Sequence, residues 1–146
     1  MHDIYYIFNI GNQINKNIKI LRWLLLAGSV YFFIVAIFHM VGIKIPPFFI
    51  YYNVPSYAYQ DRIISFLALG WSVFMFTAFL NPVKNKMLIQ AILIAGVGAV
   101  IGLEIINIYT DFESISNLIN PTIFHLESFG LAFYLALLIF FNSKSK

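Results

Sequence analysis

The sequence predicts an all-α integral membrane protein, a four-helix transmembrane bundle that follows an N-terminal amphipathic helix. Of its 146 residues, 61% are hydrophobic and only 10% are charged, whereas soluble domains carry about 25% charged residues. The mean hydropathy of +0.84 agrees with this composition. Four apolar stretches are long enough to cross a bilayer, for which about 20 residues are needed. In addition, seven of the nine Lys and Arg residues would lie on one side of the membrane.

Residues 1–20 precede the first apolar stretch and are predicted to form a cytoplasmic amphipathic helix. Small or apolar residues recur there at alternating spacings of three and four, which places them on one helix face. These residues are Ile4, Ile7, Gly11, Ile14, Ile18 and Leu21. Such a helix would lie on the inner leaflet or bind a partner. The alternative is that this segment simply extends the first transmembrane helix.

Residues 21–146 are predicted to form one transmembrane domain with four spans. The spans are residues 21–43, 63–80, 87–108 and 121–141. Each span must be helical, because hydrocarbon offers the backbone no hydrogen-bond partner. Pro82 ends the second span, since proline cannot continue the helical hydrogen bonding, and Pro121 suits the first turn of the fourth.

Small residues predict where these helices pack closely. Gly98 and Gly102 in the third span are a small-xxx-small pair, which lets another backbone approach. Ser65, Ala68 and Ser72 form a weaker seam of the same kind in the second span.

The distribution of charge predicts the topology. The N-terminal segment, the turn after residue 80 and the C-terminal tail hold seven basic residues, and only Lys44 and Arg62 fall on the other side. Positive charge is retained inside, so both termini are predicted to be cytoplasmic in the inner (plasma) membrane of a cell. The same basic residues, being topology signals, give no indication of nucleic-acid binding. The chain has no Cys, which excludes disulfides, thiolate metal sites and covalently attached haem.

The segment from Lys44 to Arg62 is an external loop rich in aromatic residues and proline. It contains Phe48, Phe49, Tyr51, Tyr52, Tyr57, Tyr59, Pro46, Pro47 and Pro55. Aromatic rings with polar tips favour the headgroup layer, so this loop is predicted to fold back as an aromatic belt. The alternatives are a lid over a cavity that opens to the outer leaflet and a surface that packs on another subunit.

Most ionisable residues within the spans fall at one depth, near the outer face. With both termini inside, one layer of the bundle contains His39, Asp61, Arg62, Glu104, His125 and Glu127, and Asn107 follows Glu104 on the same helix face. Such groups are costly in a membrane and by default face the interior, pair with one another or line a wet cavity. This layer is the candidate site.

Four interpretations of the layer stay open. It could be a set of ion pairs and hydrogen bonds that fixes the helix order, or a polar-headed pocket for a lipid, quinone or sterol-like molecule. His39 and His125 lie at similar depth and could ligate a b-type haem. An acid or base catalyst or a metal site is the fourth, but no catalytic residue or metal site is assigned. His125 and Glu127 are about 200° apart on a helix, so one ion cannot easily use both.

Several short motifs resemble those of the DoxX-like and related small four-helix bacterial membrane protein families. They are Phe38-His39-x-x-Gly42, Asp61-Arg62 leading into Ser65-Phe66-Leu67-Ala68-Leu69-Gly70-Trp71, Asn81-Pro82, and Glu127 in Leu126-Glu127-Ser128-Phe129-Gly130. The resemblance covers residues 21–141 as a layout. It implies a bacterial plasma membrane protein, and some members of these families are similar to subunits of quinone-linked membrane oxidoreductases. It implies no set of catalytic residues.

The expected function is that of a small accessory or structural subunit of a larger bacterial membrane complex, which binds lipid or quinone in the outer polar pocket. Its partners would be the bilayer and other membrane subunits, met through residues 1–20 and 44–62. The alternative is a membrane-embedded enzyme or carrier for an isoprenoid or lipid, or a haem-binding subunit.

Overall fold

A computed structural model describes residues 2–49, 51–115 and 119–145; for residues 2–15 it describes the backbone alone. The chain is helical in five places, and no strand occurs among the described residues. The helices are α1 (His2–Val41), α2 (Ala58–Leu80), α3 (Lys86–Tyr109), α4 (Phe112–Ile115) and α5 (Pro121–Ser143). The predicted all-α fold class is confirmed.

Four of these helices are long and apolar enough to cross a membrane. The candidate spans are Lys16–Val41, Ala58–Leu80, Lys86–Tyr109 and Pro121–Ser143. Each contains 23 to 26 residues, which at about 1.5 Å per residue exceeds the 30 Å of a hydrocarbon core. The fourth span, α5, starts as predicted, with proline in its first turn, and the Asn120 side chain accepts a hydrogen bond from the Thr122 N–H.

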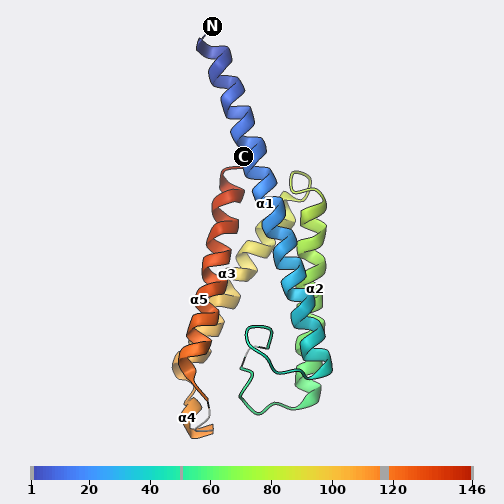
Figure 1. Cartoon of the computed structure of the whole chain (residues 1–146), viewed down its shortest axis with the longest axis vertical. Helices are drawn as coiled ribbons and strands as arrows, with labels where there is room; N and C mark the ends of the chain where they lie inside the picture. The colour runs from blue at the N-terminus through green and yellow to red at the C-terminus, as the bar shows by residue number, and fades with distance from the viewer. Residues whose placement is uncertain (1, 50, 116–118, 146) are drawn as a thin grey trace.

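The N-terminal segment is helical and continuous with the first span. Residues 2–20 and the span belong to α1, which in Figure 1 continues well past the ends of the other helices. The predicted amphipathic face depends on side chains that lie outside the described residues, apart from Ile18 and Leu21. Of these two, Leu21 is buried in the bundle.

The most extensive helix contact joins α1 and α2, which lie side by side in Figure 1. The seam predicted in the second span is used here, since Ser65, Ala68 and Ser72 are all buried. Ser29 on α1 and Ser72 exchange hydrogen bonds, each hydroxyl donating to the other residue's backbone carbonyl at 3.0 and 2.8 Å. Small side chains let the helices approach, and the hydroxyls satisfy each other in an apolar setting.

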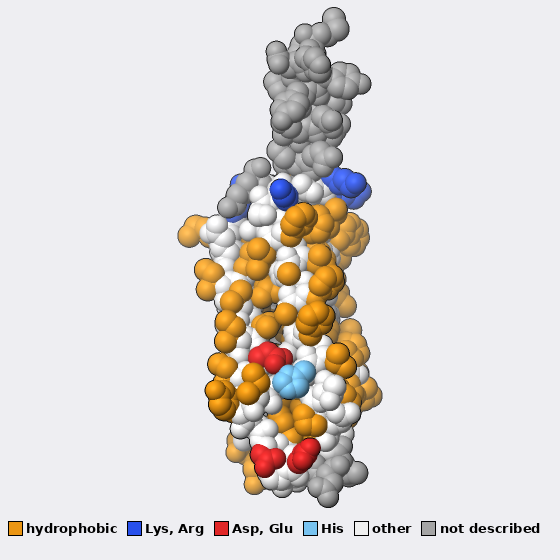
Figure 2. All heavy atoms as spheres, turned by 90° about the vertical axis from the view of Figure 1, so that its left-hand side faces the viewer, with side chains coloured by type: hydrophobic (Ala, Val, Ile, Leu, Met, Phe, Trp, Pro, Cys, Tyr) orange, Lys and Arg blue, Asp and Glu red, His pale blue; other side chains and the backbone are white. Residues whose placement is uncertain are grey.

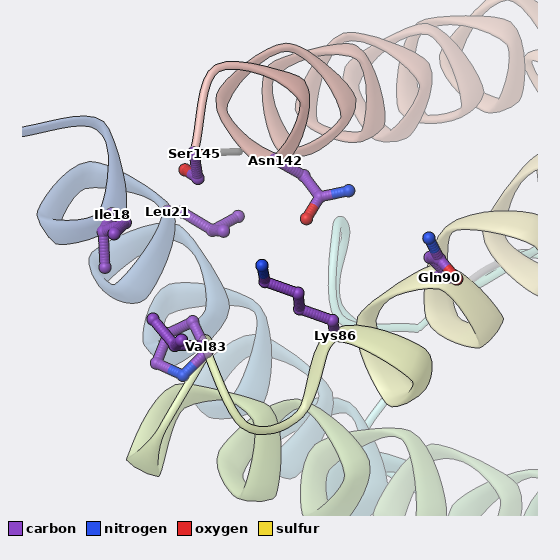
Figure 3. Close-up of a pocket in the computed structure, with 8 residues that line it drawn as sticks. Ile18, Leu21, Val83, Lys86, Gln90, Asn142 and Ser145 are labelled. Atoms are coloured by element: carbon purple, nitrogen blue, oxygen red, sulfur yellow. The ribbon is translucent and has the colours of Figure 1, made fainter. Parts of the chain in front are cut away.

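The bundle is closed at the end where both termini lie. The main core cluster gathers there from α1, α2, α3 and α5 and contains Leu21, Leu25, Met75, Ala78, Ile89, Ile92 and Leu138. Beside it, a cavity of about 30 Å³ lies between α1, the α2–α3 turn and α5, and Figure 3 shows the Lys86 side chain pointing toward this space. That volume has room for about one water, so this end is packed rather than ligand-binding.

Toward the other end, α3 leaves α2 and packs mainly on α5. The close contact comes from Gly96, where an added Cβ would lie 3.0 Å from Leu135 Cδ1. The predicted Gly98 and Gly102 pair does not make it, because a Cβ at either position would meet nothing within 4 Å. Spacing identifies a small-residue face without showing which helix covers it, so close packing at this pair stays a prediction for a helix outside the described residues.

The charge asymmetry seen in the sequence appears as two ends of the structure. Figure 2 shows Lys and Arg side chains gathered at one end of the apolar body, with acidic side chains and a histidine in its other half. The described ends of the chain lie at the basic end (Figure 1). We call this the basic end and the opposite one the acidic end.

Gly28 offers a test of the packing between α1 and α5. An added Cβ would collide with the Tyr134 hydroxyl and the Met75 sulfur, so Gly28→Ala should destabilise the fold by about 1–3 kcal/mol. Gly98→Ala is the matched control, since it meets open space and gains about 1 kcal/mol of helix propensity. Thermal unfolding followed by circular dichroism in detergent measures both variants. Equal midpoints for the two variants would contradict this arrangement.

Candidate functional site

The predicted polar layer is divided among three places near the acidic end. Glu104, Asn107 and His125 form one cluster between α3 and α5. His39 and Asp61 lie between α1, α2 and the external loop, and Arg62 is exposed beside them. Glu127 faces a groove between α1 and α5.

Asn107 on α3 is the centre of the first cluster and is buried. Its amide nitrogen donates to Ser128 Oγ at 3.0 Å and to Glu104 Oε1 at 3.4 Å, and its oxygen accepts from the Tyr51 hydroxyl at 2.9 Å. One side chain therefore connects α3, α5 and the external loop. Tyr51 and Ser128 are members of the site that the sequence did not identify.

Glu104 extends this cluster to His125 at the protein surface. The distance from Glu104 Oε2 to His125 Nδ1 is 2.9 Å, and both side chains are partly exposed. They line a hollow of about 420 Å³ between α3 and α5, together with Thr122 and Ser128. In the tautomer in which Nδ1–H donates to the carboxylate, Nε2 is left as an acceptor. This arrangement could move a proton, but no nucleophile is evident beside it among the described residues.

Tyr51 holds the external loop against the cluster. Its φ of +60° lies in the left-handed region, which is unusual for a residue with a side chain. Its ring packs on Phe124 and Phe112, with centroid distances of 4.8 and 5.6 Å. Burial, together with the carboxylates of Glu104 and Glu127, raises the pKa of the Tyr51 hydroxyl to about 12. Tyr51 therefore stays protonated and donates to Asn107 at ordinary pH.

The second place is a buried histidine beneath the loop. The His39 ring stacks on Phe49 with a centroid distance of 3.9 Å, and neither ring nitrogen has a hydrogen-bond partner among the described residues. Nearby, Ser56 donates to Asp61 Oδ2 at 3.0 Å and Lys44 donates to Ser56 Oγ at 2.7 Å. These contacts fasten the two ends of the loop to each other and to α2.

The third place is a groove of about 610 Å³ between α1 and α5, closed at the acidic end by Pro46 and Pro47. Its walls are mainly apolar, with Tyr31 and Tyr134 among them. Glu127 is the acidic residue in its lining, and both carboxylate oxygens are buried without a hydrogen-bond partner from the described part of the chain. Burying a polar group without a hydrogen-bond partner costs free energy, so a partner from outside the described chain would stabilise this carboxyl group.

The two histidines do not meet at a common hollow. His125 lines the hollow between α3 and α5, whereas His39 lies between α1, α2 and the external loop and is not among the residues that line this hollow. His39 is covered by Phe49, and Nδ1 of His125 is already engaged by Glu104. The residues therefore do not fit a haem held between them. No group of three His, Asp or Glu side chains in the described ranges could hold a metal ion.

Comparisons of the chain with protein-family models, curated proteins and solved structures found no match. The resemblance to the DoxX-like families therefore rests on the short motifs alone.

The hydrogen bond from Tyr51 to Asn107 can be tested by pH. Because the pKa of Tyr51 is raised above its ordinary value of 10.0, the stabilisation it contributes is complete below pH 10 and is lost as the pH rises toward about 12. Tyr51→Phe should lower the unfolding free energy by about 1 kcal/mol at pH 8. The difference between wild type and variant, measured from unfolding midpoints, should shrink across the window from pH 10 to about 12. If the difference in unfolding free energy between wild type and Tyr51→Phe did not change with pH, the Tyr51 hydroxyl would not be the donor to Asn107.

Proposed function

We propose that this protein is a non-catalytic membrane component that binds an amphiphilic small molecule in the groove between α1 and α5. The observation that carries the proposal is the unpartnered carboxylate of Glu127 in the wall of an otherwise apolar groove of about 610 Å³. Ligand sites are typically apolar hollows of about 300–1,000 Å³ with a few convergent polar groups. A lipid or a quinone-like molecule entering from the bilayer would meet this combination.

Glycines in the wall and a fixed external loop leave the groove open. Gly28 and Gly130 line it, and a Cβ at Gly130 would meet nothing within 4 Å. The Tyr31 hydroxyl donates to the Pro47 carbonyl at 2.9 Å, which ties the loop to α1. This contact supports the interpretation of the external loop as a cover over a cavity. The interpretation of the loop as an aromatic belt stays open as well.

We propose further that the chain acts as an accessory subunit of a larger complex in a bacterial inner membrane. An exposed face of small residues supports this role. The face of α3 that carries Ala91, Ala95 and Gly98 is exposed, and small side chains would let a helix of another subunit approach it closely. Residues 1–20 and 44–62 are the other surfaces proposed to meet such a subunit.

Filling the groove should remove the ligand. We expect wild-type protein, purified from bacterial membranes in mild detergent, to retain one amphiphile per chain in native mass spectrometry. Gly130→Leu should reduce this occupancy by about tenfold, because its side chain would occupy the groove. Gly70→Leu on α2 adds the same group outside the groove and should leave occupancy unchanged.

The same spectra test both parts of the proposal. Equal occupancy in the two leucine variants would rule out the groove as the binding site. An accessory subunit should also appear within an assembly heavier than the 16.8 kDa chain, and a stable lone monomer would count against that role.

The proposed topology places the basic end in the cytoplasm. Because the chain has no Cys, single cysteines report position directly. Tyr57→Cys lies in the exposed external loop, and Ser143→Cys lies at the exposed end of α5. A membrane-impermeant maleimide applied to intact spheroplasts should label the first, and should label the second only after the membrane is disrupted. The reverse pattern would invert the topology.

A further inference from the structure

We infer that the ligand of the α1–α5 groove carries a hydrogen-bond-donating head, an ammonium or a hydroxyl group, on an apolar chain, and that Glu127 is the residue that recognises this head. The inference rests on the proposed function and specifies the chemistry of the same site. It follows from the donors and acceptors that the groove presents and from the shape of the hollow beyond it.

The side chains of the groove offer acceptors to a ligand. Each tyrosine has a single O–H donor, and both are already used. Tyr31 donates to the Pro47 carbonyl at 2.9 Å, and Tyr134 donates to the Leu24 carbonyl at 2.8 Å. Their phenol oxygens can therefore only accept from a ligand. The carboxylate oxygens of Glu127 are acceptors without a partner in the described chain.

The backbone adds no free donor. The groove lies along the sides of α1 and α5, whose N–H groups are engaged within the helices. Where α5 begins, the Thr122 N–H is capped by the Asn120 side chain and the Ile123 N–H donates to the Asn120 carbonyl at 3.2 Å. Pro46 and Pro47 have no N–H group at all.

Basic side chains are also missing from the lining. Among the described residues that form the groove, none is Lys, Arg, His, Asn or Gln. Beside an ionised Glu127, a phosphate or carboxylate head would thus find no donor and would meet a like charge. A head that donates hydrogen bonds satisfies the carboxylate oxygens, and a cationic head also supplies the opposite charge.

The apolar part of the ligand has space beyond the head. A second hollow of about 410 Å³ lies inside the bundle and is lined mainly by apolar residues of all four long helices. Phe32, Leu131 and Tyr134 line both hollows and form the wall that they share. Trp71 lines the inner hollow and stacks on Phe32 at a centroid distance of 5.8 Å. An alkyl chain attached to a head at Glu127 would lie against Phe32, on whose ring Trp71 stacks from the other side of this wall.

Trp71 makes the inference measurable. The chain has two Trp residues, and Trp23 is 60% exposed, so Trp23→Phe leaves Trp71 as the only fluorophore of its kind. The full chain in nanodiscs is titrated with terminally brominated dodecylamine, dodecanol or dodecanoic acid, and quenching of Trp71 reports the chain of the bound probe. We expect the amine and the alcohol to bind at least about tenfold more tightly than the acid.

Substitution of the carboxylate should change the preference for the head without closing the groove. Glu127→Gln should weaken amine binding by about tenfold and bring the acid closer to the amine, because its amide supplies a donor. Glu127→Asp keeps the carboxyl group and should fall between the two, which separates recognition from a general loss of fold. Glu113→Gln removes an exposed acid of α4 outside the groove and should leave all three affinities unchanged.

The outcomes distinguish the two proposals. Preferential binding of the acid, or equal binding of all probes with no effect of Glu127→Gln, would overturn the donor-head inference while leaving the groove as a binding site. Quenching that is weak for every probe and unaffected by Gly130→Leu would overturn the proposed function itself. If the amine binds tightly and the alcohol does not, the head is a cation; if both bind, it is any hydrogen-bond donor.

Discussion

Every polar side chain inside the apolar body of this protein has to find its partner within the chain or in a ligand, because hydrocarbon offers none. Ser29 and Ser72 meet this constraint by exchanging hydrogen bonds between α1 and α2. Asn107 meets it by joining α3, α5 and the external loop. These contacts fix which helices are neighbours, which apolar packing alone does weakly, since lipid tails are as apolar as the helices.

The same constraint explains why the two ends of the bundle differ. At the basic end, apolar residues of four helices converge on one core and leave a cavity of only about 30 Å³. At the acidic end, α3 and α5 are held by Asn107 and the loop rather than by direct packing against α1 and α2. A groove of about 610 Å³ reaches the acidic end at Pro46 and Pro47, and a hollow of about 410 Å³ extends between the four long helices as far as Met75, Ile92 and Leu138 of the core. Polar contacts at the acidic end fix which helices are neighbours, so space can remain between the helices without changing their arrangement.

Much of this fold could be predicted from the sequence, because the span length of a membrane helix and the preference of Pro82 and Pro121 for helix ends depend on local chemistry. The charge asymmetry similarly predicted one layer that contains the ionisable residues. Sequence gives their depth but not their rotation around the bundle or the splay of the helices. It could not show that this layer is divided into three places, or that Gly96 rather than Gly98 contacts α5. Tyr51 was missed because a loop residue reaches Asn107 only through the tertiary fold.

The sequence placed Glu104 and Glu127 in the same layer without distinguishing them. The structure distinguishes them by their hydrogen-bond partners. Glu104 is paired with His125 and Asn107, so its charge is used in holding α3 to α5. Glu127 has no such partner, although it lies in the same half of the bundle. His39 also lacks a partner among the described residues, but its ring is covered by Phe49. An unpaired polar group can act on a ligand only where a ligand comes near it, and the Glu127 side chain lines a groove wide enough for one.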